Sequence, residues 1–303
     1  MEDDAVQNKV FFLAILLFFS LHLSLSVAPG ETAESGRSFV EAVEGNDVEA
    51  VRSLLASGFA LNGIVAEETT GAYYTPLAFA VLRCRPEMAA ILLGAGADPD
   101  GKSSSGIGAL HIAVGLSDAP EESLREGGLQ ILDLLLKHGA NPDLPDGRDA
   151  TPLALAVQSG DPAVALLLAQ RLLTAGADTA RHAFDGGVTP LLAAVGAGAA
   201  QDPANPERAI ERQHGFETRI EVVSLLLAAG ANPSAAVADG TTPLHAAATY
   251  SPAMVRTLLA AKANPRLKDA KGQTPLDWAK EYGNEEVIEI LTEAVKNKKN
   301  KKK

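Results

Sequence analysis

One six-residue pattern of small, apolar and polar positions returns along the chain, and each copy predicts the start of a helix. Its third residue is always Leu, its sixth is always Ala, and an apolar stretch follows every copy. Pro at the second position suits the first turn of a helix, because the N–H group there has no partner within the helix. The copies are TPLAFA from Thr75, GALHIA from Gly108, TPLALA from Thr151, TPLLAA from Thr189, TPLHAA from Thr242 and TPLDWA from Thr274.

The apolar stretch after each copy predicts a second helix, and four of these stretches end in a Gly-Ala step. Gly takes the left-handed conformation that commonly ends a helix, since it has no Cβ to clash. Lys262 replaces this Gly in one unit, which should cost some local stability. The chain therefore reads as a series of helix–turn–helix units. The four steps begin at Gly96, Gly139, Gly176 and Gly230.

This series resembles the ankyrin repeat, whose unit is about 33 residues long and starts with Thr-Pro-Leu-His. The six copies follow one another at intervals of 33, 43, 38, 53 and 32 residues. A terminal unit at Ser38–Asn62 lacks the Thr-Pro start but keeps the helix–turn–helix pattern. The resemblance implies an all-α fold, an ankyrin-repeat solenoid of about seven helix–turn–helix repeats with β-hairpin loops. It also implies that His111 and His245 of the starting phrases form local hydrogen bonds in the scaffold.

We expect three parts in the chain: an N-terminal tail (1–33), the ankyrin-repeat domain (34–296) and a Lys-rich C-terminal tail (297–303). Two surpluses over the 33-residue unit, around Leu116–Gly127 and Gly198–Arg219, fall between the two helices of their repeats. Insertions in a repeat array map to loops on one face, so both should lie along the same edge. A third surplus, at Val164–Thr174, predicts a second helix that is longer by about one turn.

The resemblance also implies a partner-binding surface on the hairpin tips and the first helices. Tyr and Arg are enriched at protein interfaces, and all four Tyr residues of the chain fall at positions assigned to this surface. The alternative is that these are scattered surface residues. The apolar Phe79, Ile112, Leu155 and Trp278 of the first helices are expected to pack inside. The candidate partner-binding residues are Tyr73, Tyr74, Leu82, Arg83, Arg148, Tyr250 and Tyr282.

An apolar segment near the N-terminus, residues 10–28, predicts contact with a membrane. Val10–Phe19 is uninterrupted apolar sequence, and the whole segment is just long enough to span a bilayer. Small residues at Ser26–Ala28 also fit a signal-peptide cleavage site, although Pro29 should hinder cleavage and the preceding residues are acidic. We expect a location at a membrane or in the secretory pathway. An uncleaved anchor is preferred over a cleaved signal, and a soluble cytoplasmic protein is the remaining alternative.

Charge argues against nucleic acid as a partner. Six Lys residues lie in Lys296–Lys303, and without them 20 basic residues face 38 acidic ones, a net charge of about −18. Such an acidic body repels the phosphate backbone and is not drawn to anionic membranes. The Lys run itself predicts a solvated segment beyond the last helix.

No residue pattern indicates catalysis or cofactor binding. The six His residues have no metal-ligand spacing, and Cys84 is the only cysteine. We therefore expect a monomeric, non-enzymatic scaffold or adaptor that binds a protein partner and is tethered to a membrane through residues 10–28. The first alternative is a secreted ankyrin-repeat binding protein that has lost its signal. The second, least favoured, is an enzyme that uses the insertion at residues 198–219.

Overall fold

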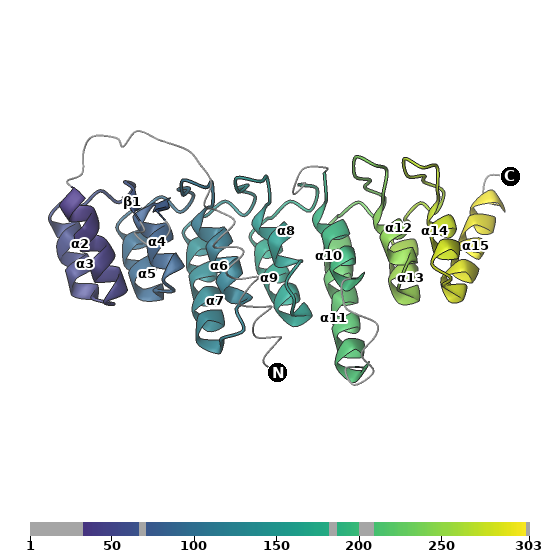
Figure 1. Ribbon diagram of the computed structural model, residues 1–303, viewed down its shortest axis with the longest axis horizontal. Helices are drawn as coiled ribbons and strands as arrows, with labels where there is room; N and C mark the ends of the chain where they lie inside the picture. Colours follow the sequence, from purple (N-terminus) through teal and green to yellow (C-terminus); the bar gives the residue numbers. More distant parts are fainter. Residues whose placement is uncertain (1–32, 67–70, 182–186, 200–208, 301–303) are drawn as a thin grey trace.

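The computed structural model describes residues 33–66, 71–181, 187–199 and 209–300, and in them seven helix pairs stand side by side in one row (Figure 1). This arrangement confirms the predicted solenoid and its seven repeats. The first helices are α2 (Ala33–Glu44), α4 (Pro76–Leu82), α6 (Ala109–Ser117), α8 (Pro152–Ala156), α10 (Pro190–Ala199), α12 (Pro243–Ala248) and α14 (Pro275–Glu281). The second helices are α3 (Val48–Ala56), α5 (Pro86–Gly94), α7 (Glu122–Lys137), α9 (Pro162–Thr174), α11 (Ala209–Ala228), α13 (Pro252–Ala260) and α15 (Glu285–Asn300).

The Thr of the repeated phrase starts the first helices by capping them. Thr75 Oγ1 accepts a hydrogen bond from the N–H of Ala78 at 3.2 Å, and Pro occupies the first helical position behind it. Thr242 and His245 form a reciprocal capping box at α12. Gly108, which replaces Thr at α6, has no side chain that could cap. Each cap satisfies a helix N–H that has no partner within the helix.

Left-handed residues end the second helices, as the Gly-Ala steps predict. Gly96 and Gly230 have φ of 96° and 97°. Lys262 takes the same conformation with φ of 71°, and Cys84 does so between α4 and α5 with φ of 51°. These two residues carry a Cβ into a region that favours glycine, so each costs on the order of 1 kcal/mol.

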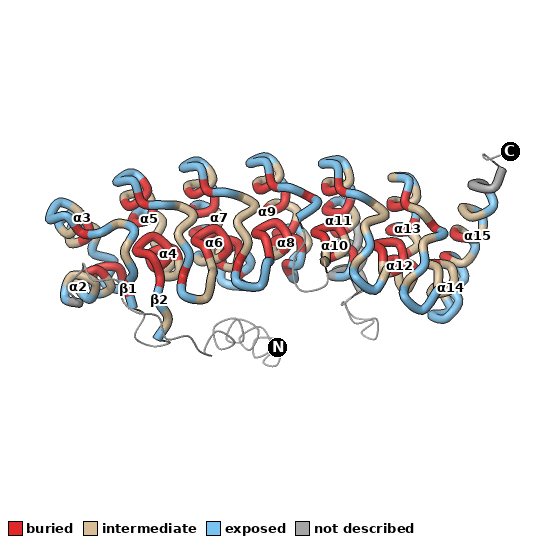
Figure 2. The backbone as a smooth tube through the Cα atoms, turned by 90° about the horizontal axis from the view of Figure 1, so that it is seen from above, coloured by how far each residue is buried: buried red, intermediate tan, exposed pale blue. Residues whose placement is uncertain are grey.

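The core is a continuous band between the two rows of helices (Figure 2). Leu77, Leu110 and Leu153 of the repeated phrase are at most 1 % exposed, and the Ala residues at its sixth position pack with them. His111 and His245 are buried, and their Nε2 atoms lie 3.0 and 3.1 Å from carbonyl oxygens of the next hairpin. Stability is therefore carried by contacts between neighbouring repeats.

Regular β-structure is sparse among the described residues. The first hairpin contains the two-stranded antiparallel sheet β1 (Val65–Ala66) and β2 (Tyr73–Tyr74), with Ala66 opposite Tyr73 and Val65 opposite Tyr74. An isolated bridge joins Lys102 to Gly108 in the second hairpin. Tight turns form much of the rest of the hairpin edge. Asp146 Oδ1, for example, accepts bonds from two N–H groups of its own turn.

Hydrogen bonds between side chains and backbone join successive hairpins. Most neighbouring hairpins share one such bond, and we call each of these bonds a rung. Four residues after Gly58, Gly96, Gly139 and Gly230, a polar side chain accepts a bond from a backbone N–H of the next hairpin. The rungs are Asn62 to Asp98 (2.8 Å), Asp100 to Asn141 (2.8 Å), Asp143 to Asp178 (2.8 Å) and Ser234 to Asn264 (2.9 Å). Ala180 stands at this position between the fourth and fifth hairpins, so its methyl group cannot form the rung.

The two insertions lie along the same edge as predicted, but their described parts are mostly helix, apart from a short turn at residues 118–121. The surplus around Leu116–Gly127 lengthens α6 and adds turns to the start of α7. The surplus around Gly198–Arg219 is divided between α10, residues 200–208 outside the described part, and the first half of α11. Figure 1 shows α7 and α11 extending beyond their neighbours at the edge away from the hairpins. The expected longer helix is α9, with 13 residues against nine in α5.

The ends of the chain differ in how far the structure describes them. Helix α15 continues to Asn300, so residues 297–300 belong to this helix and not to a tail beyond it. The prediction for residues 10–28 lies outside the described residues. In the part of the chain that the structure describes, no helix has both the length and the apolar character needed to cross a membrane.

Candidate functional site

The seven candidate partner-binding residues do not form one patch, because they lie at opposite edges of the array. Tyr73, Tyr74 and Arg148 belong to hairpins. Leu82, Arg83, Tyr250 and Tyr282 lie at the other ends of the first helices, in the turns that lead to the second helices. We call these the hairpin edge and the turn edge.

On the hairpin edge, Tyr73 and Tyr74 face opposite ways because side chains alternate along a strand. Tyr73 is 42 % exposed and Tyr74 is buried at 9 %, so the interpretation of Tyr74 as a surface residue is wrong. Arg148 is exposed, and its Nη2 lies 3.6 Å from Asp146 Oδ2. The hairpin edge therefore keeps Tyr73 and Arg148 as candidates.

On the turn edge, the Arg83 side chain contacts other residues of the array. Its Nη2 donates to Glu44 Oε1 at 3.2 Å, and its guanidinium carbon lies 4.9 Å from the centre of the Phe79 ring. Leu82 is half-buried and packs against the core. Tyr282, which follows α14, is 63 % exposed. Among the four candidates of this edge, Tyr282 presents the most open side chain.

Tyr250 is a structural residue and not part of an open surface, contrary to the sequence interpretation. Its hydroxyl donates to the Val195 carbonyl oxygen of α10 at 2.5 Å, and its ring packs against the core. Burial raises the pKa of this phenol well above its ordinary value. The side chain therefore links the sixth repeat to the fifth.

Arg219 is a buried charge that the sequence reasoning missed. It is 2 % exposed, and its Nη1 and Nη2 donate to the carbonyl oxygens of Val157 and Ser159, each at 2.8 Å. Burial lowers the pKa of the guanidinium, and its Nε has no hydrogen-bond partner among the described residues. The spacing of Arg219 from Val222 and Leu226 puts it on the buried face of α11, which is the signal that could have revealed it.

The α8–α9 turn is held from both neighbouring repeats. Arg219 reaches it from α11, and on the other side the Ser159 hydroxyl donates to the carboxylate of Asp118, which follows α6. Desolvation raises the pKa of the Asp118 carboxyl, and the bond from Ser159 opposes this shift. We call Asp118, Ser159, Arg219 and Tyr250 the turn-edge network. It connects the third to the sixth repeat away from the hairpins.

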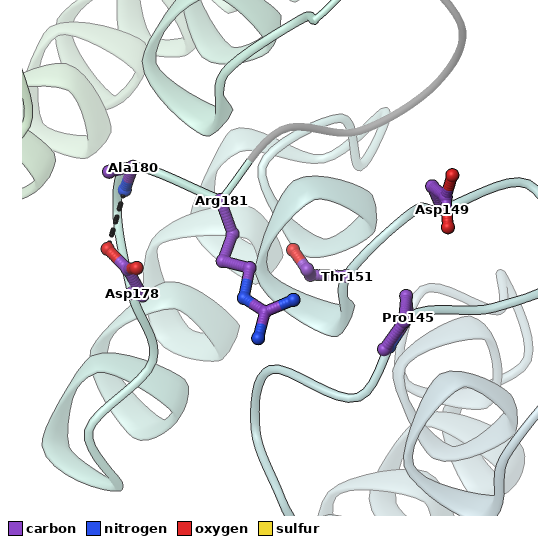
Figure 3. A pocket seen from close by; sticks show the side chains of 6 residues that line it. All are labelled: Pro145, Asp149, Thr151, Asp178, Ala180 and Arg181. Atoms are coloured by element: carbon purple, nitrogen blue, oxygen red, sulfur yellow. Dashed lines mark hydrogen bonds between the residues drawn. The ribbon is translucent and has the colours of Figure 1, made fainter.

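A shallow hollow of about 400 Å³ opens between the third and fourth hairpins (Figure 3). Asp149 lines one side, Asp178 and Arg181 line the other, and Thr151 forms part of its floor. The Arg181 side chain extends into the hollow, and Asp178 Oδ1 accepts the N–H of Ala180 at 2.8 Å. Such a hollow can receive one polar side chain of a partner, but it offers no enclosed volume for a cofactor.

The described residues bring together no catalytic constellation. Within them, no group of three His, Cys, Asp or Glu side chains could hold a metal ion. Cys84 is half-buried, and burial raises the pKa of its thiol, which makes the thiolate scarcer at neutral pH. Much of the insertion considered for an enzyme, residues 200–208 and the side chains up to 217, lies outside the described part.

Comparison with known proteins identifies the repeats. Residues 212–303 match the family model for ankyrin repeats in three copies, and residues 105–147 match the model for a single ankyrin repeat. Among curated proteins, none matches the chain.

Solved structures extend the likeness to most of the chain. The ankyrin repeat domain of Bcl-3, described as a unique member of the IkappaB protein family, is 26% identical with a TM-score of 0.64, over 88% of this chain and 100% of that one. An ankyrin repeat domain from Acinetobacter baumannii AYE is 26% identical with a TM-score of 0.58, over 75% of this chain and 98% of that one. The human ASB11 ankyrin repeat domain shares the fold at 24% identity and a TM-score of 0.54, over 80% of this chain and 90% of that one.

The chain thus contains ankyrin repeats and has the fold of an ankyrin repeat domain. Repeats of this kind serve as surfaces for protein–protein interaction.

Proposed function

We propose that this protein is an interaction scaffold that binds a partner protein along its hairpin edge. One observation carries the proposal: the hairpins form a rigid, laddered row from which Tyr73 and Arg148 project, while the apolar side chains of the helices are packed inside. Rigid Tyr and Arg side chains on a preorganised surface lose little entropy on binding, and they are enriched among the residues that dominate binding energy.

A photoreactive phenylalanine analogue placed at Tyr73 or Arg148 tests which face binds. We expect it to form adducts of one defined mass with a cellular protein, because the hairpin edge contacts the partner. The matched control places the same analogue at Glu49 or Glu289, exposed residues of the second helices α3 and α15. Adducts that form only from the second helices, or equally from both faces, would contradict the proposed surface.

We further propose that residues 10–28 tether this scaffold to a membrane. The apolar run at Val10–Phe19 supports this proposal. In intact vesicles that carry the protein with a C-terminal tag, the full-length protein should resist carbonate extraction, and removal of the tag by added protease would place the array on the outer side of the vesicle. A protected tag on a shortened, freely extracted product would favour the second candidate, a secreted binding protein with a cleaved signal. An uncleaved product that carbonate extracts would exclude both.

A further inference from the structure

The outer face of the first hairpin carries an apolar pair of side chains. Ile64 is 46 % exposed and Tyr73 is 42 % exposed. Ala66 is paired with Tyr73 and shares its face of the strand pair. Ile64 lies just before β1, and because it is exposed while Val65 after it is buried, it continues the same face. Ile64 and Tyr73 are diagonal neighbours, close enough for an aromatic ring to reach across.

The position of this face is fixed by its surroundings. The alternate residues Val65 and Tyr74 are buried beneath it, at 1 % and 9 % exposure. The backbone of Tyr73 is bound on its other side to the second hairpin: its N–H donates to Ser104 Oγ at 3.2 Å, and its carbonyl accepts from the Ser104 N–H at 2.8 Å. A ligand would meet Tyr73 already in place, and little conformational freedom would be lost on binding.

Exposed apolar side chains of this size are rare elsewhere in the described chain. Besides Ile64 and Tyr73, only Tyr282, in the last repeat, is a large hydrophobic residue with an exposed side chain among the described residues. Singly exposed hydrophobic residues need no explanation, but two that share one face of a rigid hairpin make a small binding patch.

The surface that continues from this face is acidic. In the described residues of the second to fourth hairpins (97–108, 140–151 and 177–181), six Asp residues stand against three basic ones. Side chains of both signs are engaged within the array: Lys102 Nζ donates to the Pro145 carbonyl at 2.6 Å, Arg148 pairs with Asp146, and five of the six Asp carboxylates accept backbone N–H bonds. The excess of three negative charges remains. A ligand that leaves the apolar face along the hairpins would therefore meet a net negative surface.

We propose that Ile64, Ala66 and Tyr73 anchor an extended segment of a partner protein in which an apolar side chain is followed by Lys or Arg residues. The apolar side chain packs on Ile64 and Tyr73, and the basic residues lie along the acidic hairpins. The patch is too small to hold a second copy of this chain, since stable interfaces bury more than about 1,000 Å². This inference rests on the proposed function and specifies the partner for it.

A displayed library of random 12-residue peptides, selected against the full chain, tests the anchor. Selected peptides should carry one large apolar residue next to two or more Lys or Arg residues. The double variant Ile64→Ser/Tyr73→Ser should bind them at least about tenfold more weakly, the effect typical of a binding hot spot. Tyr282→Ser is the matched control, because it removes an exposed Tyr (63 %) far from the first hairpin, and its peptide binding should be unchanged.

Changes in the peptide keep the test independent of the folding of any variant. Replacing the Lys residues of a selected peptide with Glu should abolish its binding to the wild-type chain. Equal binding to the Ile64→Ser/Tyr73→Ser variant, or selection of acidic peptides, would overturn the anchor. Self-association that this variant loses would show a second copy as the occupant and overturn it too. Photo-adducts at position 148 without any selected peptide would contradict the proposed anchor at Ile64 and Tyr73. The proposed scaffold function would still be supported by that result.

Discussion

Arg219→Ala should lower the free energy of unfolding by about 3–5 kcal/mol, because it leaves two buried carbonyl oxygens without donors and opens a cavity. The two carbonyl oxygens of Val157 and Ser159 would lose their donors at 2.8 Å, and the side chain, only 2 % exposed, would leave a cavity. The measurement is the shift of the urea midpoint of the full chain at unchanged slope. Arg219→Lys should lose part of this energy, since an ammonium cannot donate to both carbonyls in the geometry of a guanidinium fork.

Arg256 provides the control for Arg219. Its Nη1 pairs with Glu286 at 3.0 Å, but both side chains are more than half exposed, so Arg256→Ala should cost at most about 1 kcal/mol. A loss below about 1 kcal/mol for Arg219→Ala would contradict the structural role of the turn-edge network. Equal losses for the two variants would do the same.

Gly128→Ala should destabilise the protein by up to about 2 kcal/mol, although Ala is the better helix former. Gly128 lies in α7, and a Cβ there would come within 2.6 Å of the Ser117 backbone nitrogen and 2.9 Å of the Leu116 carbonyl carbon. The gain in helix propensity is about 1 kcal/mol, while overpacking against backbone atoms costs about 1–3 kcal/mol or more. The steric effect should therefore decide the sign.

Gly115→Ala is the matched substitution without the clash. Gly115 is also inside a helix, α6, but a Cβ there would meet nothing within 4 Å. It should raise the melting temperature, with a gain of roughly 0.5–1 kcal/mol. If Gly128→Ala stabilised the protein as much as Gly115→Ala does, the close packing of α7 on α6 would be contradicted.

Local sequence predicted the helical framework because the signals for it are local. Thr75 with Pro76 starts α4 through contacts within four residues, and Gly96 ends α5 by its own conformation. The number of repeats followed from the recurring Leu and Ala, which every repeat needs in order to stack on its neighbour. Even Lys262 and Cys84 adopt the left-handed conformation, since the repeat geometry outweighs their local cost.

The candidate site was predicted less well, because the positions of its side chains depend on distant residues. Tyr73 and Tyr74 are adjacent in sequence, and only the register of a short strand pair decides which of them is exposed. Tyr250 follows α12 like a surface residue, yet its acceptor is Val195, 55 positions earlier. The enrichment of Tyr at interfaces gives no information about a hydrogen-bond acceptor in another repeat, so Tyr250 was assigned to the surface.

Arg219 and the insertions show the same limit. An Arg at the end of a polar insertion would be expected to have a solvent-exposed side chain. Its spacing to Val222, however, places Arg219 on the inner face of α11. The surpluses around Leu116–Gly127 and Gly198–Arg219 were assigned to loops because repeat insertions often are. In the structure they lengthen existing helices, which adds backbone hydrogen bonds at each added turn.

The missing rung at Ala180 gives the array a preferred direction of bending. At this junction, between the fourth and fifth repeats, Arg219 fastens the turn edge to Val157 and Ser159, while among the described residues the hairpin edge lacks the side-chain bond that other junctions have. Under load, the fourth and fifth repeats should separate first at their hairpins and rotate about the contacts of their turns. The array would then flatten or tighten around a bound partner at one place along its length, with the repeats on each side moving as stiff blocks.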